Sequence, residues 1–393
     1  MIDLFLRKGA DHRLRGGHLW VYSNEVDSQR SRLIDFVAGD LVAVRNTNGK
    51  LLGSAYMDPS ALICARMYAL GEQCVMDTAL FTSRLEAALA MRLAVFKKPF
   101  YRLVYGDSDA LPGLIVDRFG DYLVMQINNS GLERYREPLL AALVAALKPR
   151  GILLRADSRI RREQGLSADS VVVFGEVPQH VPLEENGVQF LAPVFDGQKT
   201  GWFYDHRMSR ARLVNWVKDK SVLDVYSYIG GWGLQAAAFG ASQVCCLDSS
   251  AQALDGVDAN ASLNQVESRI VTRRGSAPET MASMIAEGSR FEVIILDPPA
   301  FIQRKKDLKK GMAAYRRINE LGLQLLQSGG LLVSASCSMH LSRADLMTAM
   351  QQAAVRAGCD IRVVEQGAQG PDHPIHPAIP ETEYLKAVFA RKM

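Results

Sequence analysis

Apolar residues after about residue 186 fall into short uninterrupted runs separated by longer stretches of helical character. The runs are Val222-Leu223-Asp224-Val225, Val244-Cys245-Cys246-Leu247, Val293-Ile294-Ile295-Leu296 and Leu331-Leu332-Val333. Continuous apolar runs are typical of strands buried on both faces, and their alternation with helices predicts a doubly wound parallel sheet. We therefore expect residues 186–393 to form one α/β domain with a Rossmann-like sheet.

The residues before this sheet show two other patterns. Residues 1–78 alternate short β-like runs with Gly39-Asp40 and Asn48-Gly49 turns, which predicts a small β-barrel. Residues 79–185 predict a small central α+β domain, with helices near its start and over about 132–148. Its strands are expected near 101–106, 114–118, 121–128, 151–156 and 170–175.

Composition narrows the class of protein only slightly. The 393 residues suffice for two or three domains, and the six cysteines include no CxxC pair, which argues against a disulfide framework and a zinc site. No stretch offers the roughly 20 apolar residues of a membrane helix. The first eight residues do not form a signal peptide. We expect a cytoplasmic protein that uses no metal and no membrane.

The net charge of +4 is a weak indication of an anionic partner, and two local basic groups are more informative. Such groups are more often solvated faces, but their position near the predicted site favours phosphate contact. The first group is Arg155, Arg159, Arg161 and Arg162, and the second is Lys305, Lys306, Lys309, Lys310, Arg316 and Arg317.

A cofactor signal follows the first strand of the predicted sheet. Asp224 precedes Gly230-Gly231, and glycines there let the backbone approach a ligand at a helix N-terminus. Asp248 ends the second strand, where a carboxylate can accept hydrogen bonds from a ribose diol. The glycines lie too far from the strand for a dinucleotide fingerprint. The acidic Asp224 suits the cationic amino acid tail of S-adenosylmethionine instead.

Two short strings follow the third and fourth apolar runs: Asp297-Pro298-Pro299-Ala300-Phe301 and Ser336-Cys337-Ser338. If their strands are neighbours, both strings lie at the edge of the sheet where ligands bind. Together they suggest methyl transfer to a pyrimidine carbon.

The order DVYSYIGG, LDSSAQAL, DPPAF and SCS resembles the class I S-adenosylmethionine-dependent methyltransferases that make 5-methylcytosine in 23S rRNA, a family with an N-terminal PUA domain. The likeness extends to three earlier segments, so it covers nearly the whole chain. These are Leu6-Arg7-Lys8-Gly9 with Gly17-His18-Leu19-Trp20-Val21-Tyr22, the central Leu111-Pro112-Gly113-Leu114-Ile115-Val116-Asp117-Arg118, and Gly197-Gln198-Lys199-Thr200-Gly201-Trp202-Phe203-Tyr204-Asp205-His206-Arg207.

The resemblance implies a reaction and roles for the two strings. Carbon 5 of cytosine is a poor nucleophile, so such enzymes add a cysteine thiolate to carbon 6 and let carbon 5 attack the methyl sulfonium. Cys337 would be the nucleophile, and Asp297 would hydrogen-bond the edge of the flipped base. Pro298 and Pro299 would shape the pocket, while Phe301 stacks on the base or packs in the protein.

The resemblance also implies a cofactor site and further substrate contacts. Its substrate would be 23S rRNA or a large-subunit precursor, and homodimers are compatible with it. Family positions for S-adenosylmethionine correspond to Asp224, Tyr226, Gly230, Asp248 and Ser249, with Ser276 standing where many relatives have an acidic residue. A motif near the active site supplies Lys199, Tyr204, Asp205 and Arg207, of which Arg207 fits a structural ion pair equally well. Candidate RNA contacts in the first domain are Arg13, Arg15, His18 and Trp20, although core packing of Trp20 or Tyr22 is expected.

Three alternatives remain at this point. DPPAF is close to strings that hold an exocyclic amine beside a methyl donor, so RNA amine methylation is one, and it needs no cysteine. A ribosome-assembly factor that binds RNA without catalysis is the second. A nicotinamide oxidoreductase is the third, and the misplaced glycines argue against it.

Overall fold

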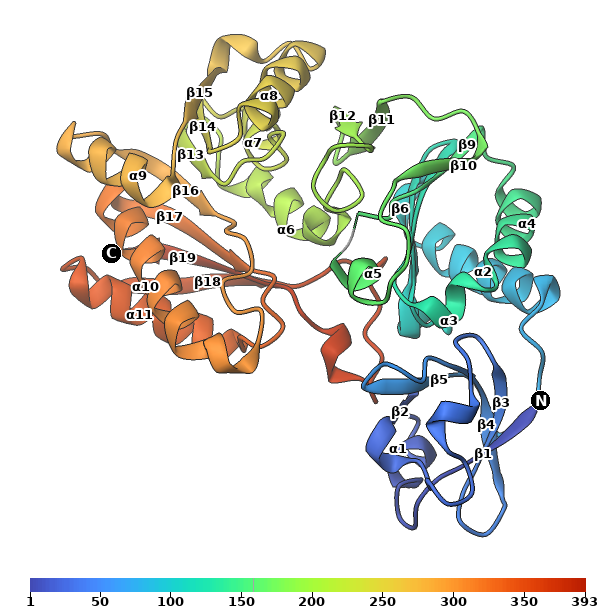
Figure 1. Ribbon diagram of the computed structural model, residues 1–393. Helices are drawn as coiled ribbons and strands as arrows, with labels where there is room; N and C mark the ends of the chain where they lie inside the picture. Colours follow the sequence, from blue (N-terminus) through green and yellow to red (C-terminus); the bar gives the residue numbers. More distant parts are fainter. Residues whose placement is uncertain (158) are drawn as a thin grey trace. The chain divides into compact units, whose positions relative to one another are not determined.

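The computed structural model describes residues 1–157 and 159–393, which fold into two compact units with separate cores (Figure 1). The first unit comprises Met1–Val181, Pro193–Trp202 and Pro371–Thr382. The second comprises Pro182–Ala192, Phe203–Gly370 and Glu383–Met393. The predicted division into three domains, 1–78, 79–185 and 186–393, stays a prediction.

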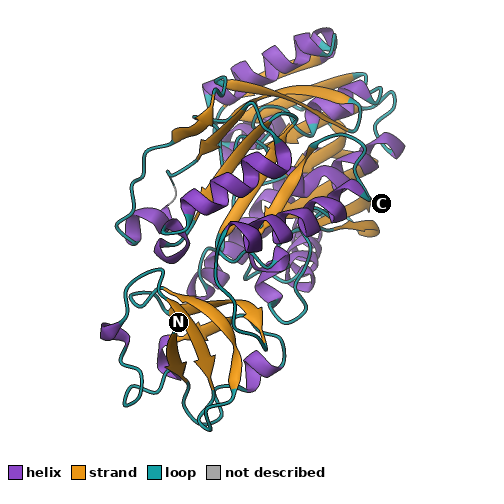
Figure 2. Ribbon diagram, turned by 90° about the vertical axis from the view of Figure 1, so that its right-hand side faces the viewer, coloured by secondary structure: helices purple, strands orange, loops and turns teal. Residues whose placement is uncertain are grey.

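The N-terminal part of the first unit is a curved five-stranded sheet in the order β1-β3-β4-β5-β2 (Figure 2). Its inward side chains, such as Val42, Val44 and Met67, form one apolar cluster, as the alternating pattern predicts. Its elements are β1 (Ile2–Phe5), α1 (His12–Arg15), β2 (Trp20–Tyr22), β3 (Leu41–Arg45), β4 (Leu51–Met57) and β5 (Ile63–Leu70).

A second five-stranded sheet of the same unit has the order β10-β9-β8-β7-β6. Helices α2 and α4 pack against each other, and their apolar faces join the core of this sheet. The expected strands and helices are confirmed within a few residues, but the helix expected over 132–148 is broken near Tyr135. The elements are α2 (Thr78–Leu93), β6 (Phe100–Tyr105), β7 (Leu114–Phe119), β8 (Tyr122–Ile127), α3 (Ser130–Glu133), α4 (Arg136–Leu147), β9 (Gly151–Leu154), α5 (Arg159–Glu163) and β10 (Val171–Gly175).

The second unit contains a seven-stranded sheet in the order β15-β14-β13-β16-β17-β19-β18. Its first five strands are parallel, which confirms the predicted doubly wound sheet, whereas β19 runs antiparallel between β17 and β18. The strands are β13 (Ser221–Val225), β14 (Gln243–Asp248), β15 (Ile270–Arg274), β16 (Phe291–Leu296), β17 (Leu326–Ser336), β18 (Ile361–Gly367) and β19 (Lys386–Lys392).

Helices cover both faces of this sheet (Figure 1). Helices α9, α10 and α11 share one large core cluster with the strands, while α7 and α8 pack on β13, β14 and β15. A hairpin of β11 (His180–Glu185) and β12 (Val188–Pro193) precedes the sheet. The helices are α6 (Arg207–Ala211), α7 (Gly233–Ala238), α8 (Ala251–Leu263), α9 (Ala277–Ala286), α10 (Leu308–Leu325) and α11 (Arg343–Arg356). Among the described residues, no helix is long and apolar enough to cross a membrane.

Candidate active site

The loops after β16 and β17 are neighbours, as expected from the sequence, because these strands are paired in parallel. A buried tyrosine on α10 ties the loops together. The Tyr315 hydroxyl lies 2.7 Å from Ser336 Oγ and 2.9 Å from Ser338 Oγ, and Ser338 Oγ accepts a 3.3 Å hydrogen bond from the Ile302 amide. The serines flanking Cys337 are therefore structural supports that fix its loop against the loop of Asp297.

Asp297 is held from two sides within the second unit. Its Oδ2 accepts a 3.0 Å hydrogen bond from Trp232 Nε1, and its Oδ1 lies 3.2 Å from His206 Nε2. Burial disfavours the charged carboxylate, but the charge of His206 and these hydrogen bonds outweigh burial and hold the pKa of Asp297 below its ordinary value. Asp297 is therefore an oriented carboxylate, and each oxygen keeps a second lone pair for a ligand.

Cys337 is half-buried directly after β17, beside a buried lysine. Lys386 begins β19 opposite Ser336, and its ammonium donates to the carbonyl oxygens of Ser338 at 2.7 Å and Tyr384 at 2.8 Å. Burial lowers the pKa of Lys386 to about 8, while the charge of Cys337 acts in the opposite direction. A thiolate at Cys337 would therefore favour the charged form of Lys386.

The remaining residues of the DPPAF string have different environments. Pro298 is buried, Pro299 is exposed, and Phe301 is half-buried with its ring 4.9 Å from that of Tyr315. Phe301 therefore packs in the protein, which is one of its two expected roles. It also lines a pocket of about 220 Å³ together with Gln303, Lys310 and Gly311.

Asp224 has the chemistry that a cationic cofactor requires. It is fully buried at the end of β13, its Oδ2 accepts a 2.8 Å hydrogen bond from the Gly233 amide, and its Oδ1 has no hydrogen-bond partner. Burial, opposed by the Gly233 hydrogen bond and aided by the charge of Asp297, raises the pKa of Asp224 to about 7. An ammonium group at Oδ1 would supply the missing partner.

The loop beside Asp224 has a conformation that requires glycine. A Cβ on Gly233 would lie 2.7 Å from Cys246 Sγ and 3.0 Å from Asp224 Oδ2, so only glycine fits there. Gly230 has φ +86°, and Tyr226 and Tyr228 have φ values of 66° and 50°, in the left-handed region. This loop fits the expected cradle for S-adenosylmethionine, and the half-buried Tyr226 lies on it.

The predicted ribose and adenine contacts lie on the next two strand ends. Asp248 ends β14, and its carboxylate accepts hydrogen bonds from the amides of Tyr228 at 3.0 Å and Ser250 at 2.9 Å. Ser249 and Ser276 are exposed, and Ser276 directly precedes α9 without a capping hydrogen bond from its side chain. Asp248 is thus fixed by the glycine loop itself, whereas the roles of Ser249 and Ser276 toward the cofactor stay predictions.

The predicted motif before the sheet is mostly buried. Arg207 Nε lies 3.5 Å from a carboxylate oxygen of Glu185, and its guanidinium covers the ring of Tyr204 at 5.1 Å. Asp205 accepts a 2.5 Å hydrogen bond from the Tyr384 hydroxyl. Arg207 therefore has the structural ion pair that the sequence left open, and substrate contact by Tyr204 and Arg207 stays a prediction. Lys199 is exposed and belongs to the first unit.

Sequence reasoning missed three residues of the site. His206 and Trp232 position Asp297, and Lys386 faces the loop of Cys337. His206 lies inside a string that the sequence analysis singled out, and Trp232 directly follows the string DVYSYIGG, which was an unused signal. The sequence contained no comparable signal for Lys386, because its place beside Cys337 depends on the antiparallel register of β19.

Two members of the first basic group do not form the expected phosphate-binding face, whereas Arg162 is exposed. Arg155 and Arg161 are each only 2% exposed. Arg155 forms a 2.7 Å ion pair with Asp157, and Arg161 a 2.7 Å ion pair with Glu133. Buried guanidinium groups need such partners, so these arginines hold the fold. The side chain of Arg159 lies outside the described residues. Four lysines of the second group are exposed: Lys305, Lys306, Lys309 and Lys310.

The candidate RNA contacts of the N-terminal sheet form a connected cluster. Arg13 forms an ion pair with Glu25 at 2.7 Å and lies 3.2 Å from a ring nitrogen of His18. Trp20 is half-buried and donates from Nε1 to Asp107 at 2.9 Å, whereas Arg15 is exposed. Between Trp20 and Tyr22, both half-buried, Val21 is the buried residue.

Comparisons with known proteins agree with this arrangement. Residues 4–70 match the PUA-like domain family, and residues 131–391 match the family described as S-adenosylmethionine-dependent methyltransferase. Proteins called ribosomal RNA large subunit methyltransferase I from Enterobacter sp. (strain 638) and Yersinia pestis are each 34% identical over 100% of both chains.

Solved structures show the same fold. A candidate S-adenosylmethionine-dependent methyltransferase from Streptococcus mutans covers 100% of both chains with TM-score 0.82 at 20% identity. Another candidate methyltransferase, complexed with SAH, has TM-score 0.84 at 19% identity over 100% of both chains. The M. jannaschii tRNA m1G37 methyltransferase covers 79% of this chain and 78% of its own, with TM-score 0.51 at 17% identity. The shared fold alone therefore does not choose the methylated atom.

Proposed function

The chain belongs to the PUA-domain-containing, S-adenosylmethionine-dependent large-subunit ribosomal RNA methyltransferases, and from this premise we propose that it methylates carbon 5 of a cytosine in 23S rRNA. The observation that supports carbon as the acceptor is the buried Lys386, which lies at the strand end that borders Cys337. A reaction at nitrogen needs no nucleophilic cysteine and no buried cation to support one.

Cys337 would start the reaction. Its thiolate adds to carbon 6 of the cytosine, and the electron pair of the carbon 5–carbon 6 double bond makes carbon 5 nucleophilic. The Lys386 ammonium, fixed by two carbonyl oxygens, stabilises the thiolate before the addition. Carbon 5 would then form a bond to the methyl group as the bond between that methyl and the donor sulfur breaks, so the donor leaves as a thioether. Removal of the carbon 5 proton would finally expel the thiolate from carbon 6, so Cys337 returns to its first state.

Asp297 would assist the same addition from the edge of the base. Since its pKa lies below the ordinary value, Asp297 is a hydrogen-bond acceptor at neutral pH. An acceptor at this place stabilises the form of cytosine that is protonated at N3, and that form accepts the thiolate more readily. His206 and Trp232 keep the carboxylate in position, so we assign them positioning roles.

The cofactor supplies an electrophilic methyl group on a sulfonium. The residues that would hold it are Asp224 for the ammonium group of its amino acid tail and Asp248 for the ribose hydroxyls. Gly230 and Gly233 let this loop pack closely against Leu234, Cys246 and Asp224, which fixes the place of the Asp224 carboxylate. This set belongs to one edge of the sheet, at the ends of β13 and β14.

The test compares two cysteine variants. Cys337→Ala should bind S-adenosylmethionine as the wild type does and should lose at least about a thousandfold in methyl transfer to carbon 5. Cys359→Ala, which removes another half-buried thiol, is the control and should retain full activity. The readout is mass-spectrometric mapping of 5-methylcytosine in 23S rRNA from cells that lack the protein and carry each variant.

The alternatives give other outcomes. Surviving 5-methylcytosine with Cys337→Ala would overturn the cysteine mechanism, and a methylated exocyclic amine in both variants would identify an RNA amine methyltransferase. Failure of the wild type to bind S-adenosylmethionine in calorimetry would favour the assembly factor. The family match already leaves no support for the nicotinamide oxidoreductase.

A further inference from the structure

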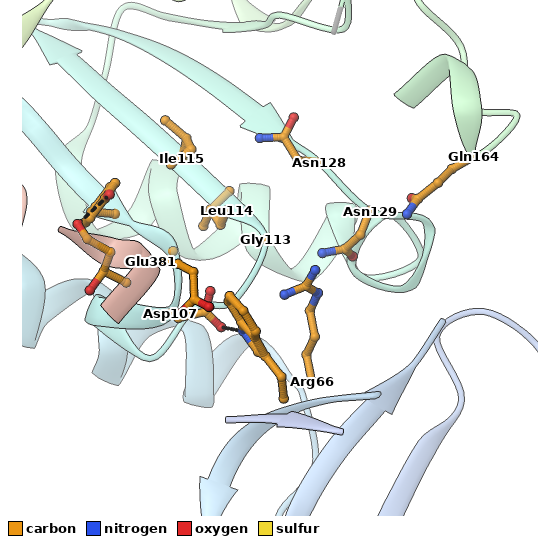
Figure 3. Close-up of a pocket in the computed structure, with 13 residues that line it drawn as sticks. Arg66, Asp107, Gly113, Leu114, Ile115, Asn128, Asn129, Gln164 and Glu381 are labelled. Atoms are coloured by element: carbon orange, nitrogen blue, oxygen red, sulfur yellow. Dashed lines mark hydrogen bonds between the residues drawn. The ribbon is translucent and has the colours of Figure 1, made fainter. Parts of the chain in front are cut away.

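The first unit contains a pocket of about 280 Å³ where its two sheets meet, lined by apolar surface together with several polar and charged side chains (Figure 3). Trp20 and Arg66 come from the N-terminal sheet, while Asp107 and Asn128 come from the ends of strands in the second sheet. Glu381 and Thr382 complete the wall from the segment Pro371–Thr382. Figure 3 shows Arg66 reaching toward the pocket, with Asp107 and Glu381 toward one end and Gln164 toward the other.

Part of the wall is rigid, which is a property of prebuilt binding sites. Asn129 donates to the Tyr56 hydroxyl at 2.8 Å and accepts from the Leu132 amide at 2.7 Å. Gly113, with φ +81°, leaves the space for Asn129, because a Cβ there would lie 1.8 Å from Asn129 Nδ2. Gln164 is fixed by hydrogen bonds to Ser130 and Asp58. The glycine of the Leu111-Pro112-Gly113-Leu114 string is thus required by the pocket wall.

Two groups of the pocket have unused binding capacity. Arg66 Nε is buried and has no hydrogen-bond partner, and the guanidinium carbon lies 5.7 Å from the centroid of the Trp20 ring. Asp107 is joined to Trp20 through its Oδ1, which fixes the carboxylate and the indole relative to each other. An aromatic face, an arginine and carboxylates therefore surround one small volume.

This set of groups fits a nucleobase better than a phosphate. The carboxylates of Asp107 and Glu381 repel an anion, but they accept hydrogen bonds from N–H groups. Guanine presents two kinds of N–H donor on one edge and the acceptors O6 and N7 on another, and arginine is their common partner. Indole rings stack on bases.

We propose that this pocket binds a guanine of the RNA substrate, at a position other than the methylated cytosine. Asp107 and Glu381 would accept from its N1–H and N2–H groups, Arg66 would donate to O6 or N7, and Trp20 would contact its face. The proposal rests on the proposed function, because that function supplies the RNA, and it adds a sequence preference to substrate recognition.

Four ten-nucleotide RNAs test it in fluorescence anisotropy with the full-length protein. They are identical pyrimidine strands with a single central guanosine, adenosine, inosine or 7-deazaguanosine. We expect guanosine to bind about tenfold more tightly than adenosine, because one mismatched base costs about 1–3 kcal/mol. Inosine lacks the N2 amine and 7-deazaguanosine lacks N7, so each should lose part of that preference.

Arg66→Gln should abolish the preference for guanosine over adenosine. Arg32→Gln is the matched control, since Arg32 is exposed in the segment between β2 and β3 of the same unit and pairs with Asp35. Equal binding of the four RNAs by the wild type, or a preference that survives Arg66→Gln, would overturn the proposal. Binding is measured without S-adenosylmethionine, so failure here leaves carbon 5 methylation intact, and a failed methylation proposal leaves this readout intact.

Discussion

Asp224 shows how one buried side chain joins stability to ligand binding. Its pKa is raised to about 7 from an ordinary value near 3.8, so the fold disfavours its charge. The ligand-free protein therefore loses stability as the pH rises from about 4 through 7, by up to about 4 kcal/mol. The proposed ammonium of the ligand would offset this cost by binding the unused Oδ1.

The first prediction concerns the pH dependence of ligand binding. The affinity for S-adenosylhomocysteine should increase roughly tenfold between pH 6 and pH 8, because the ionised fraction of Asp224 rises about tenfold across a pKa near 7. Calorimetry of the wild type and Asp224→Asn measures this. The variant should bind weakly with no such rise beyond the ligand's own titration, and it should be more stable than the wild type at pH 8 without ligand. An equal pH dependence in both proteins would contradict the assignment.

Strand β19 carries two buried or partly buried lysines whose contacts are closely matched. Lys386 donates to the carbonyl oxygens of Ser338 at 2.7 Å and Tyr384 at 2.8 Å. Lys392 donates to the carbonyl oxygens of Leu323 and Leu326, each at 2.7 Å. Only Lys386 lies at the end of the strand that borders Cys337. Comparing substitutions of Lys386 and Lys392 therefore distinguishes an effect on the Cys337 thiolate from an effect on the stability of β19.

The second prediction uses this pair. Lys386→Met should raise the pKa of Cys337 and slow its alkylation by iodoacetamide about tenfold at pH 7.5, because the neighbouring cation is gone. In the wild type this support should fade above about pH 8, where Lys386 loses its proton. Mass spectrometry of the peptide that contains Cys337, between pH 6 and pH 9.5, gives the profile. Lys392→Met should match the wild type, and unchanged alkylation of Lys386→Met would refute the role.

The sequence predicted most strands of the seven-stranded sheet, but it predicted fewer of the side chains that surround Asp297 and Cys337. Strands β13, β14, β16 and β17 were predictable because strands buried on both faces are continuous apolar runs. Asp297 and Cys337 followed from the ends of two such runs. The neighbour of Cys337 did not follow, because a lysine is rarely buried and the register of β19 is set by long-range pairing. The prediction for Arg155 and Arg161 was wrong for the converse reason, because the sequence does not show that these arginines are buried and paired with Asp157 and Glu133.

The whole chain forms two compact units with separate cores, and the proposed cofactor residues Asp224 and Asp248 belong to the second unit. The third prediction is that scanning calorimetry resolves two unfolding transitions. S-adenosylhomocysteine at one hundred times its dissociation constant should raise one of them by roughly 5–10 °C and leave the other unchanged.

Asp224→Asn is the control for this experiment and should remove the shift. A single transition that moves as a whole on adding ligand would show that the units unfold together. The guanine pocket belongs to the first unit, so a guanosine-containing RNA should act on the transition that S-adenosylhomocysteine leaves unchanged.

The half-titrated carboxyl of Asp224 has a consequence for turnover. On the proposed contact, the site releases about half a proton into solution at pH 7 when an ammonium-bearing ligand enters, and takes the same amount back when the site empties. Conversion of the bound methyl donor to spent product leaves that ammonium in place, so chemistry at the sulfur moves no proton at Asp224. Uptake and release of protons by the protein would therefore follow the emptying and filling of the site, and not the methyl transfer itself.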